Sequence, residues 1–278
     1  MSKKTKRSRQ SIGNIAKSQH IEEYLILIHT QIARSDYAGV VDTGQKLLGY
    51  LPKRSEEYAE ILGYIGTSHA KMRHFPQAYD TFTEALSIQP DNAYFWFNRG
   101  VIDEFVGRLG QSVRDLESAV ELLFADPSDP LARDAERALK RNMKAAQKAM
   151  KKRGPHFTLD QLIEQESLNL QGLALAKAQK WEEAEQVFRR VIALGDCYPQ
   201  PWGNLGFCLM EQKRYDEAEA AWKKALSIDW RYSLARMNLR GLKDVRRGEQ
   251  VTKGVFVDSY EDGKTKKKFV LREENPEK

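Results

Sequence analysis

The side chains that could bind a metal ion or act as nucleophiles are few in this chain of 278 residues. They are five histidines and two cysteines: His20, His29, His69, His74, His156, Cys197 and Cys208. No histidine pair has the HxxxH or HExxH spacing of a zinc site, and the two cysteines form no CxxC motif. We therefore expect no metal site, and we expect both cysteines to be small apolar residues in a reducing compartment.

The motifs that hold a phosphate group or a catalytic serine are also missing. The sequence contains no GxxxxGK[ST], no GxGxxG and no GxSxG. Its many Asp and Glu residues have the spacing of solubilising charge on helices. The sequence therefore predicts a non-catalytic protein that has no cofactor and no small-molecule substrate.

The net charge of +6 is concentrated at the N-terminus. Residues 1–20 contain six of the 45 Lys and Arg residues and no acid, so the remaining chain carries 39 charges of each sign. Such a segment is typical of a disordered, solvated tail, and contact with nucleic acid or an anionic surface is the alternative. No run of eighteen apolar residues occurs, and no apolar core of signal-peptide length follows the tail. We expect a soluble, cytoplasmic protein without membrane contact.

A repeat of 34 residues organises most of the chain. Two pairs of units share one register, 59–92 with 93–126 and 165–198 with 199–232, and a weaker unit covers 21–54. The repeat pattern is defined by positions four, seven, eight, seventeen, twenty, twenty-four, twenty-seven and thirty-two of each unit. In the unit 59–92 these positions are, in order, Leu62, Ile65, Gly66, Phe75, Ala78, Phe82, Ala85 and Pro90. The unit 199–232 has Trp202, Leu205, Gly206, Tyr215, Ala218, Trp222, Ala225 and Trp230 at the same positions. The unit 93–126 departs from the pattern with Arg99 at position seven and Ser112 at position twenty.

The apolar spacing inside each unit predicts a helix, a short polar turn and a second helix. We expect the small residues at positions eight and twenty to permit a close helix crossing, with the aromatic residues at positions four and twenty-four around it. In particular, we expect the Trp one turn before each glycine, such as Trp202 before Gly206, to cover that crossing. A single hairpin cannot bury its apolar face alone, so neighbouring hairpins must stack.

This pattern resembles the tetratricopeptide repeat. The resemblance implies an all-α, right-handed superhelical solenoid of helix-turn-helix repeats. It also implies a concave groove, lined mainly by positions two, five, nine, twelve and thirteen, that binds a protein segment. The groove positions of the last full unit are Gln200, Gly203, Phe207, Met210 and Glu211. Over both arrays, the groove residues that we select are Tyr94, Phe97, Val101, Phe105, Asn169, Phe207 and Met210. The chain lacks the family's clamp for a C-terminal carboxylate, because positions five and nine are Gly63 and Thr67 in one array and Asn169 and Leu173 in the other.

A long helix is predicted between the two pairs of units, with Asp129-Pro130 as its start and Gly154-Pro155 as its end. From Arg133 to Arg153 it carries nine basic residues and two acids. Its predicted basic patch consists of Lys140, Arg141, Lys144, Lys148, Lys151 and Lys152. This patch is either a solvated face or a binding site for an acidic partner or a phosphate backbone. Thr158 and Gln161 then form a capping box for the next helix.

The C-terminal region predicts one further helix and a small β-hairpin. The helix follows residue 232 and would cap the solenoid. Asp262-Gly263 is a turn signal that pairs Phe256 with Phe269. The predicted domains are a basic tail (1–20), an N-terminal array (21–126), a basic linker helix (127–157), a C-terminal array with its capping helix (158–250), and the β-hairpin with a tail (251–278).

These observations predict a non-catalytic scaffold or adaptor that binds a peptide or helix of a partner protein in its groove. The alternative is a nucleic-acid- or ribosome-associated factor that uses the basic tail and the basic helix at 133–153. The apolar groove favours the first hypothesis. The chain's own basic helix or hairpin could instead cover that groove.

Overall fold

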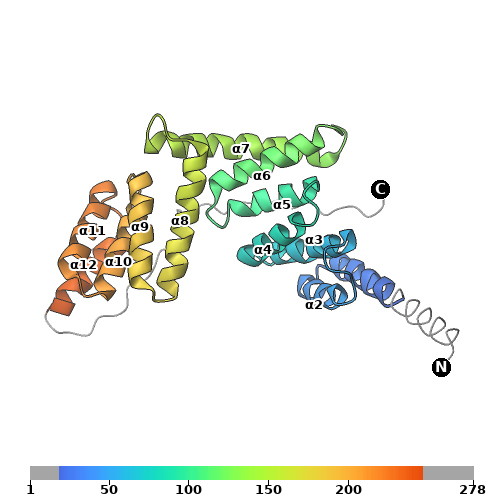
Figure 1. Ribbon diagram of the computed structural model, residues 1–278, viewed down its shortest axis with the longest axis horizontal. Helices are drawn as coiled ribbons and strands as arrows, with labels where there is room; N and C mark the ends of the chain where they lie inside the picture. Colours follow the sequence, from blue (N-terminus) through green and yellow to red (C-terminus); the bar gives the residue numbers. More distant parts are fainter. Residues whose placement is uncertain (1–18, 247–278) are drawn as a thin grey trace, which may run out of the picture. The chain divides into compact units, whose positions relative to one another are not determined.

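The computed structural model describes residues 19–246, and all regular structure in this range is helical (Figure 1). Residues 19–33 form a first helix. It is followed by α2 (Tyr37–Leu48), α3 (Glu56–Lys71), α4 (Phe75–Leu86), α5 (Ala93–Asp103), α6 (Leu109–Leu123), α7 (Pro130–Arg153), α8 (Leu159–Lys177), α9 (Trp181–Leu194), α10 (Pro199–Glu211), α11 (Tyr215–Ile228) and α12 (Ser233–Arg246). The predicted all-α architecture of helical hairpins is confirmed. The predicted β-hairpin and nearly all of the basic tail lie outside the described residues.

The chain divides into two compact units. Within the described residues, unit 1 comprises 19–106 and 114–139, and unit 2 comprises 107–113 and 140–246. Helices α6 and α7 therefore each contribute residues to both units. Helix α7 has the predicted start and end, but its N-terminal part belongs to the core of unit 1. The predicted division into two arrays joined by a linker helix stays a prediction.

Position fifteen of every repeat has the same backbone conformation. Its φ angle is positive in all five units, at Ser35 (56°), Arg73 (64°), Gly107 (77°), Gln179 (60°) and Lys213 (63°). In the C-terminal repeat, the N–H of Arg214 donates to the carbonyl of Leu209 at 2.9 Å. This bond and the left-handed residue together form the Schellman motif that ends a helix. The weak unit 21–54 has the equivalent bond from Asp36 to Gln31, at 2.8 Å, and therefore shares the register of the others.

The glycine at position eight contacts the large side chain at position twenty-four. A Cβ at Gly66 would lie 2.9 Å from the ring of Phe82, and one at Gly206 would lie 2.5 Å from the indole of Trp222. The prediction of a close helix crossing is confirmed. The side chain nearest to Gly206 belongs to position twenty-four, however, and not to the position-four Trp202, which is only half-buried. The reason is that position twenty-four lies on the facing helix and enters the gap directly.

The two departures of the unit 93–126 from the repeat pattern are each matched by a polar partner. Arg99 donates from Nε and Nη2 to both carboxylate oxygens of Asp115, at 2.5 and 3.0 Å, and both side chains are largely buried. Its guanidinium also lies 4.9 Å from the ring centroid of Trp96. The Ser112 hydroxyl accepts a 2.7 Å hydrogen bond from the Asn142 amide of α7. Each replacement therefore keeps its buried polar atoms bonded within the described structure.

Candidate partner-binding surfaces

In unit 1, the predicted groove residues of α5 lie under helix α7. Phe97 and Val101 are only 2% and 4% exposed, and they share a buried cluster with Leu131 and Ala135 of α7. The expectation that they line an open groove is wrong, because the chain's own basic helix covers this face. The sequence leaves that alternative open, because spacing alone does not give the position of α7 against α5.

The two remaining predicted groove residues of the unit 93–126, Tyr94 of α5 and Phe105 of the turn after α5, are also engaged within unit 1. Tyr94 is half-buried, and its hydroxyl donates to the Asp129 carboxylate at 3.4 Å. Phe105 stacks on Phe75, with 4.5 Å between the ring centroids. The structure therefore brings the predicted aromatic groove together as part of a core and not as an accessible surface.

In unit 2, one of the predicted groove residues is a core residue. Phe207 is 6% exposed and makes an edge contact with Trp181, with 5.8 Å between the ring centroids. Met210 is half-buried and packs against the hydrophobic core of this unit. Phe207 therefore packs inside unit 2.

Two buried amide groups in unit 2 have an unsatisfied oxygen. Asn169 is at groove position five of α8 and is 5% exposed, and Gln200 is at groove position two of α10. Within the described part of the chain, neither Asn169 Oδ1 nor Gln200 Oε1 has a hydrogen-bond partner. Helices α8 and α10 contact each other directly. The repeat register placed both residues on the groove side, but their lack of partners depends on the packing.

Helix α12 continues this row of first helices and exposes apolar side chains. If Ser233 is counted as position one, then Leu234, Met237 and Gly241 hold positions two, five and nine. Met237 is 51% exposed, and Trp230, in the turn before α12, is 72% exposed. Helix α12 contacts both α10 and α11. The prediction of a final helix packed on the last repeat is confirmed.

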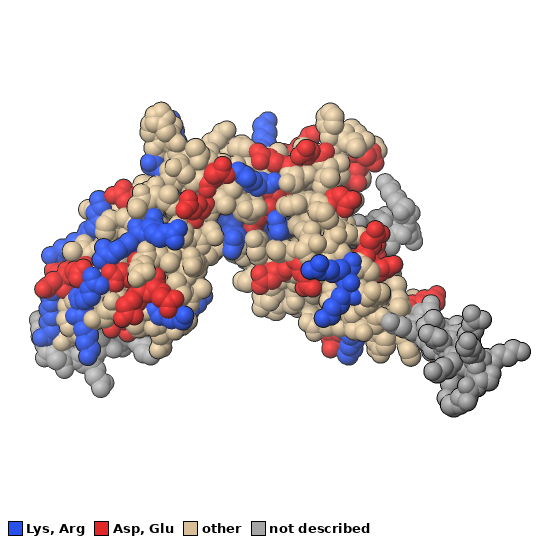
Figure 2. Space-filling view, viewed as in Figure 1, with Lys and Arg blue, Asp and Glu red and all other residues tan. Residues whose placement is uncertain are grey.

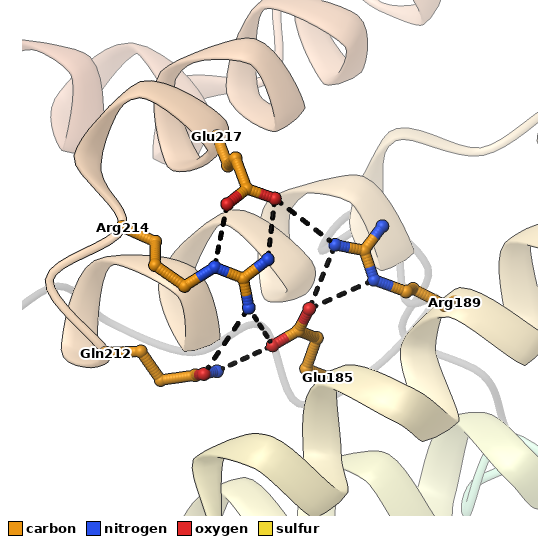
Figure 3. A network of polar contacts seen from close by, with 5 residues as sticks. All are labelled: Glu185, Arg189, Gln212, Arg214 and Glu217. Atoms are coloured by element: carbon orange, nitrogen blue, oxygen red, sulfur yellow. Dashed lines mark hydrogen bonds and ion pairs between the residues drawn. The ribbon is translucent and has the colours of Figure 1, made fainter.

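A polar network joins α9 to the turn between α10 and α11 (Figure 3). The carboxylate of Glu185 accepts hydrogen bonds from Arg189 at 2.9 Å and Gln212 at 2.8 Å. It also accepts one from Arg214 at 2.7 Å, and Arg214 pairs in addition with Glu217 at 2.6 Å. Burial of Glu185 opposes its ionisation, but the bonds from Gln212, Arg189 and Arg214 hold its pKa below the ordinary value. The charged network therefore links α9 of one repeat to the turn and to α11 of the next repeat.

A second buried carboxylate lies at the beginning of α6. Glu166 Oε2 accepts a 2.8 Å hydrogen bond from the backbone N–H of Gly110, in the first turn of that helix. Burial raises the pKa of Glu166 from 4.5 to about 7, and the Gly110 bond and the charges of Arg153 and Arg108 oppose this rise. Glu166 is at groove position two of α8, but it is occupied with α6.

All six residues of the predicted basic patch are exposed on α7: Lys140, Arg141, Lys144, Lys148, Lys151 and Lys152. Lys152 also lies 4.6 Å from the ring centroid of Tyr198. The C-terminal helices differ from the basic patch of α7 in that they carry charges of both signs. Figure 2 shows basic and acidic side chains mixed over them, as in the ion pairs of Lys223 with Glu219 and Arg246 with Asp216.

Neither a metal cluster nor a membrane helix is found between residues 19 and 246. No three His, Cys, Asp or Glu side chains come together there in a way that could hold a metal ion. No helix in the same range is long and apolar enough to cross a membrane.

The thiol of Cys208 is buried, and this burial raises its pKa to about 12.

Comparison with known proteins identifies the repeat. Residues 199–229 match the family model of the tetratricopeptide repeat. No curated protein matches the chain. Among solved structures, it is similar to MamA, with 13% identity over 85% of this chain and 100% of that chain and a TM-score of 0.38. It is also similar to YrrB, described as "a TPR protein with an unusual peptide-binding site". The identity is 16% over 81% of this chain and 98% of that chain, and the TM-score is 0.36. The chain is similar as well to the P58(IPK) TPR domain, with 14% identity over 82% of this chain and 65% of that chain and a TM-score of 0.43.

Proposed function

We propose that this tetratricopeptide-repeat protein is a non-catalytic scaffold that binds an extended segment of a partner protein along the first helices of unit 2. The segment would follow α8, α10 and α12 and contact Asn169, Gln200 and Met237. The observation that carries the proposal is the pair of unpartnered amide oxygens on adjacent first helices. The groove of α5 is excluded from it, because α7 covers Phe97.

Backbone N–H groups of a partner would satisfy these oxygens. A buried polar atom without a hydrogen bond costs about 1–3 kcal/mol, so Asn169 and Gln200 gain when a donor arrives. An extended segment presents a backbone N–H and C=O at every residue except proline, whereas its side chains vary. Recognition through the backbone would thus place few demands on the partner's sequence at these two contacts.

The apolar side chains and the charge of this row favour a neutral, partly apolar segment. Met237 is an exposed and flexible apolar contact at groove position five of α12. None of the groove positions two, five and nine on α8, α10 and α12 is Lys or Arg. These three positions therefore supply no cation for a terminal carboxylate, and we propose an internal segment of the partner as the ligand. The predicted cytoplasmic location of the protein stays a prediction.

Affinity capture from a nuclease-treated cell extract tests this proposal. The double variant Asn169→Ala, Gln200→Ala should retain at least about fivefold less of the partner than the wild type, because two neutral hydrogen bonds contribute about 1–3 kcal/mol. Gln171→Ala is the matched control, since Gln171 is an exposed amide on the same helix α8. Met237→Glu should also lower retention.

Equal retention of the same proteins by the wild type and the double variant would contradict the proposal. The retained protein would next be divided into overlapping peptides, and their affinities would be measured by calorimetry. Binding only by peptides that end in the native carboxylate would rule out an internal segment.

A further inference from the structure

The six exposed cations between residues 140 and 152 of α7 lie on one face of the helix. An α-helix turns by about 100° and rises by about 1.5 Å per residue. At that turn, the side chains from Lys140 to Lys152 fall within an arc of about 120°, and they span about 18 Å along the helix. We call this face the lysine stripe: Lys140, Arg141, Lys144, Lys148, Lys151 and Lys152.

The lysine stripe has little neutralising charge. The chain contains no Asp or Glu between Glu136 and Asp160. Within residues 19–246, Lys140, Lys144 and Lys148 form no ion pair. Like charges four residues apart on a helix destabilise it by a few tenths of a kcal/mol per pair, that is, about 0.2–0.5 kcal/mol. The stripe therefore repels itself, and a bound polyanion would relieve that repulsion.

The opposite face of α7 is anchored inside unit 2. Ala146 is fully buried, and Asn142 donates its 2.7 Å hydrogen bond to Ser112 of α6. The helix thus presents the stripe from a fixed position.

The side chains of the stripe distinguish between the polyanions that could bind. Within the described residues, the large apolar side chains with high exposure include Phe124 and Trp230, but none lies between 140 and 153. Apart from the half-buried Tyr198 beside Lys152, the stripe therefore lacks the apolar and aromatic core that protein interfaces use and the row of stacking aromatic side chains that single-stranded nucleic acid uses. Lysines, which act as point charges on flexible stems, fit phosphate groups without base contacts.

We propose that the lysine stripe binds the phosphate backbone of a double-stranded nucleic acid, independently of its base sequence. This surface does not involve Asn169, Gln200 or Met237, and it does not depend on the proposed function. Double-stranded DNA and double-stranded RNA share the chemistry that it recognises.

The test is fluorescence anisotropy with the full chain and a labelled duplex of about 20 base pairs, titrated between about 50 and 200 mM salt. The variant Lys144→Gln, Lys148→Gln is compared with the control Arg34→Gln, Lys53→Gln. The control removes two exposed cations from unit 1 and leaves the net charge equal. The slope of log affinity against log salt should become less negative by about 1.8 in the stripe variant only, since each lost phosphate contact contributes about 0.9. Circular dichroism checks that both variants are folded.

Further probes separate the alternatives. Equal affinity for duplexes of different base sequence supports the proposal, and the relative affinities of DNA and RNA duplexes identify which of them is preferred. Equal slopes for the stripe variant and its control would overturn the proposal. Tighter binding of a single strand, or of polyglutamate with the same dependence on Lys144 and Lys148, would also overturn it. The polyglutamate result would indicate an acidic protein partner.

Discussion

The indole of Trp222 lies directly over Gly206, where its Nε1 is 2.5 Å from the place that a Cβ would occupy. The same Nε1 donates a 3.0 Å hydrogen bond to the carbonyl of Gly203, one turn earlier in α10. Trp222 itself is fully buried. Trp222 therefore holds α10 against α11 through one close contact and one hydrogen bond.

We expect Gly206→Ala to destabilise the protein by about 1–2 kcal/mol. In an exposed helix the same change would stabilise by about 1 kcal/mol, but overpacking of the kind required here costs about 1–3 kcal/mol. Urea denaturation measures the difference. Combination with Trp222→Phe should cost less than the two single changes together, because a phenylalanine at the equivalent site leaves 2.9 Å at Gly66, compared with 2.5 Å between Trp222 and Gly206. A stabilised Gly206→Ala protein would contradict this account of the glycine.

We expect Gly107→Ala to cost about 1 kcal/mol through the backbone alone. The φ angle of Gly107 is 77°, and no atom lies within 4 Å of a Cβ placed there, so the change causes strain but no clash. Gly107→Asn should cost less, because Asn tolerates the left-handed conformation better than Ala. Thermal unfolding of the two variants beside the wild type gives the comparison. Equal losses from Ala and Asn would argue against conformational strain as the cause.

The buried Glu166 should make the protein less stable as the pH rises. Its pKa is raised from 4.5 to about 7 in the folded state, so the folded protein binds the proton more tightly than the unfolded chain. The resulting stabilisation is complete below about pH 4.5 and is lost as the pH rises through about 7. A rise of this size corresponds to about 3 kcal/mol.

The comparison with Glu166→Gln isolates this contribution from the other carboxylates. The amide keeps an oxygen for the Gly110 N–H but does not titrate. Between pH 4.5 and 8, the free energy of unfolding of the wild type should fall by about 3 kcal/mol relative to the variant. Urea denaturation at several pH values measures both. Parallel pH profiles would show that Glu166 has an ordinary pKa.

The helical hairpins and their register could be predicted because they depend on neighbours in sequence. Positions eight and twenty-four lie on the two helices of one hairpin, so the close crossing at Gly66 follows from spacing, although the side chain that fills it was expected at position four and is Phe82 at position twenty-four. The capping box of Thr158 and Gln161 is local as well, and the structure confirms it. The left-handed turn residues were not predicted, since only Gly107 of the five is a glycine.

The candidate site was predicted less well. Phe97 and Phe207 occupy groove positions, yet both are buried. Spacing assigns a residue to one face of a helix, but it does not reveal whether another helix covers that face. The roles of Arg99 and Ser112 also depended on their partners Asp115 and Asn142, which the repeat pattern does not identify.

The sequence by itself therefore determined the repeat, its helices and the basic face of α7, because a 34-residue period and helical spacing are properties of neighbouring residues. Only the tertiary structure decided which of these faces remain accessible. It placed α7 over Phe97, it left the oxygens of Asn169 and Gln200 without partners, and it exposed the lysine stripe. The physical reason is that burial and hydrogen bonding depend on which helices pack together in space.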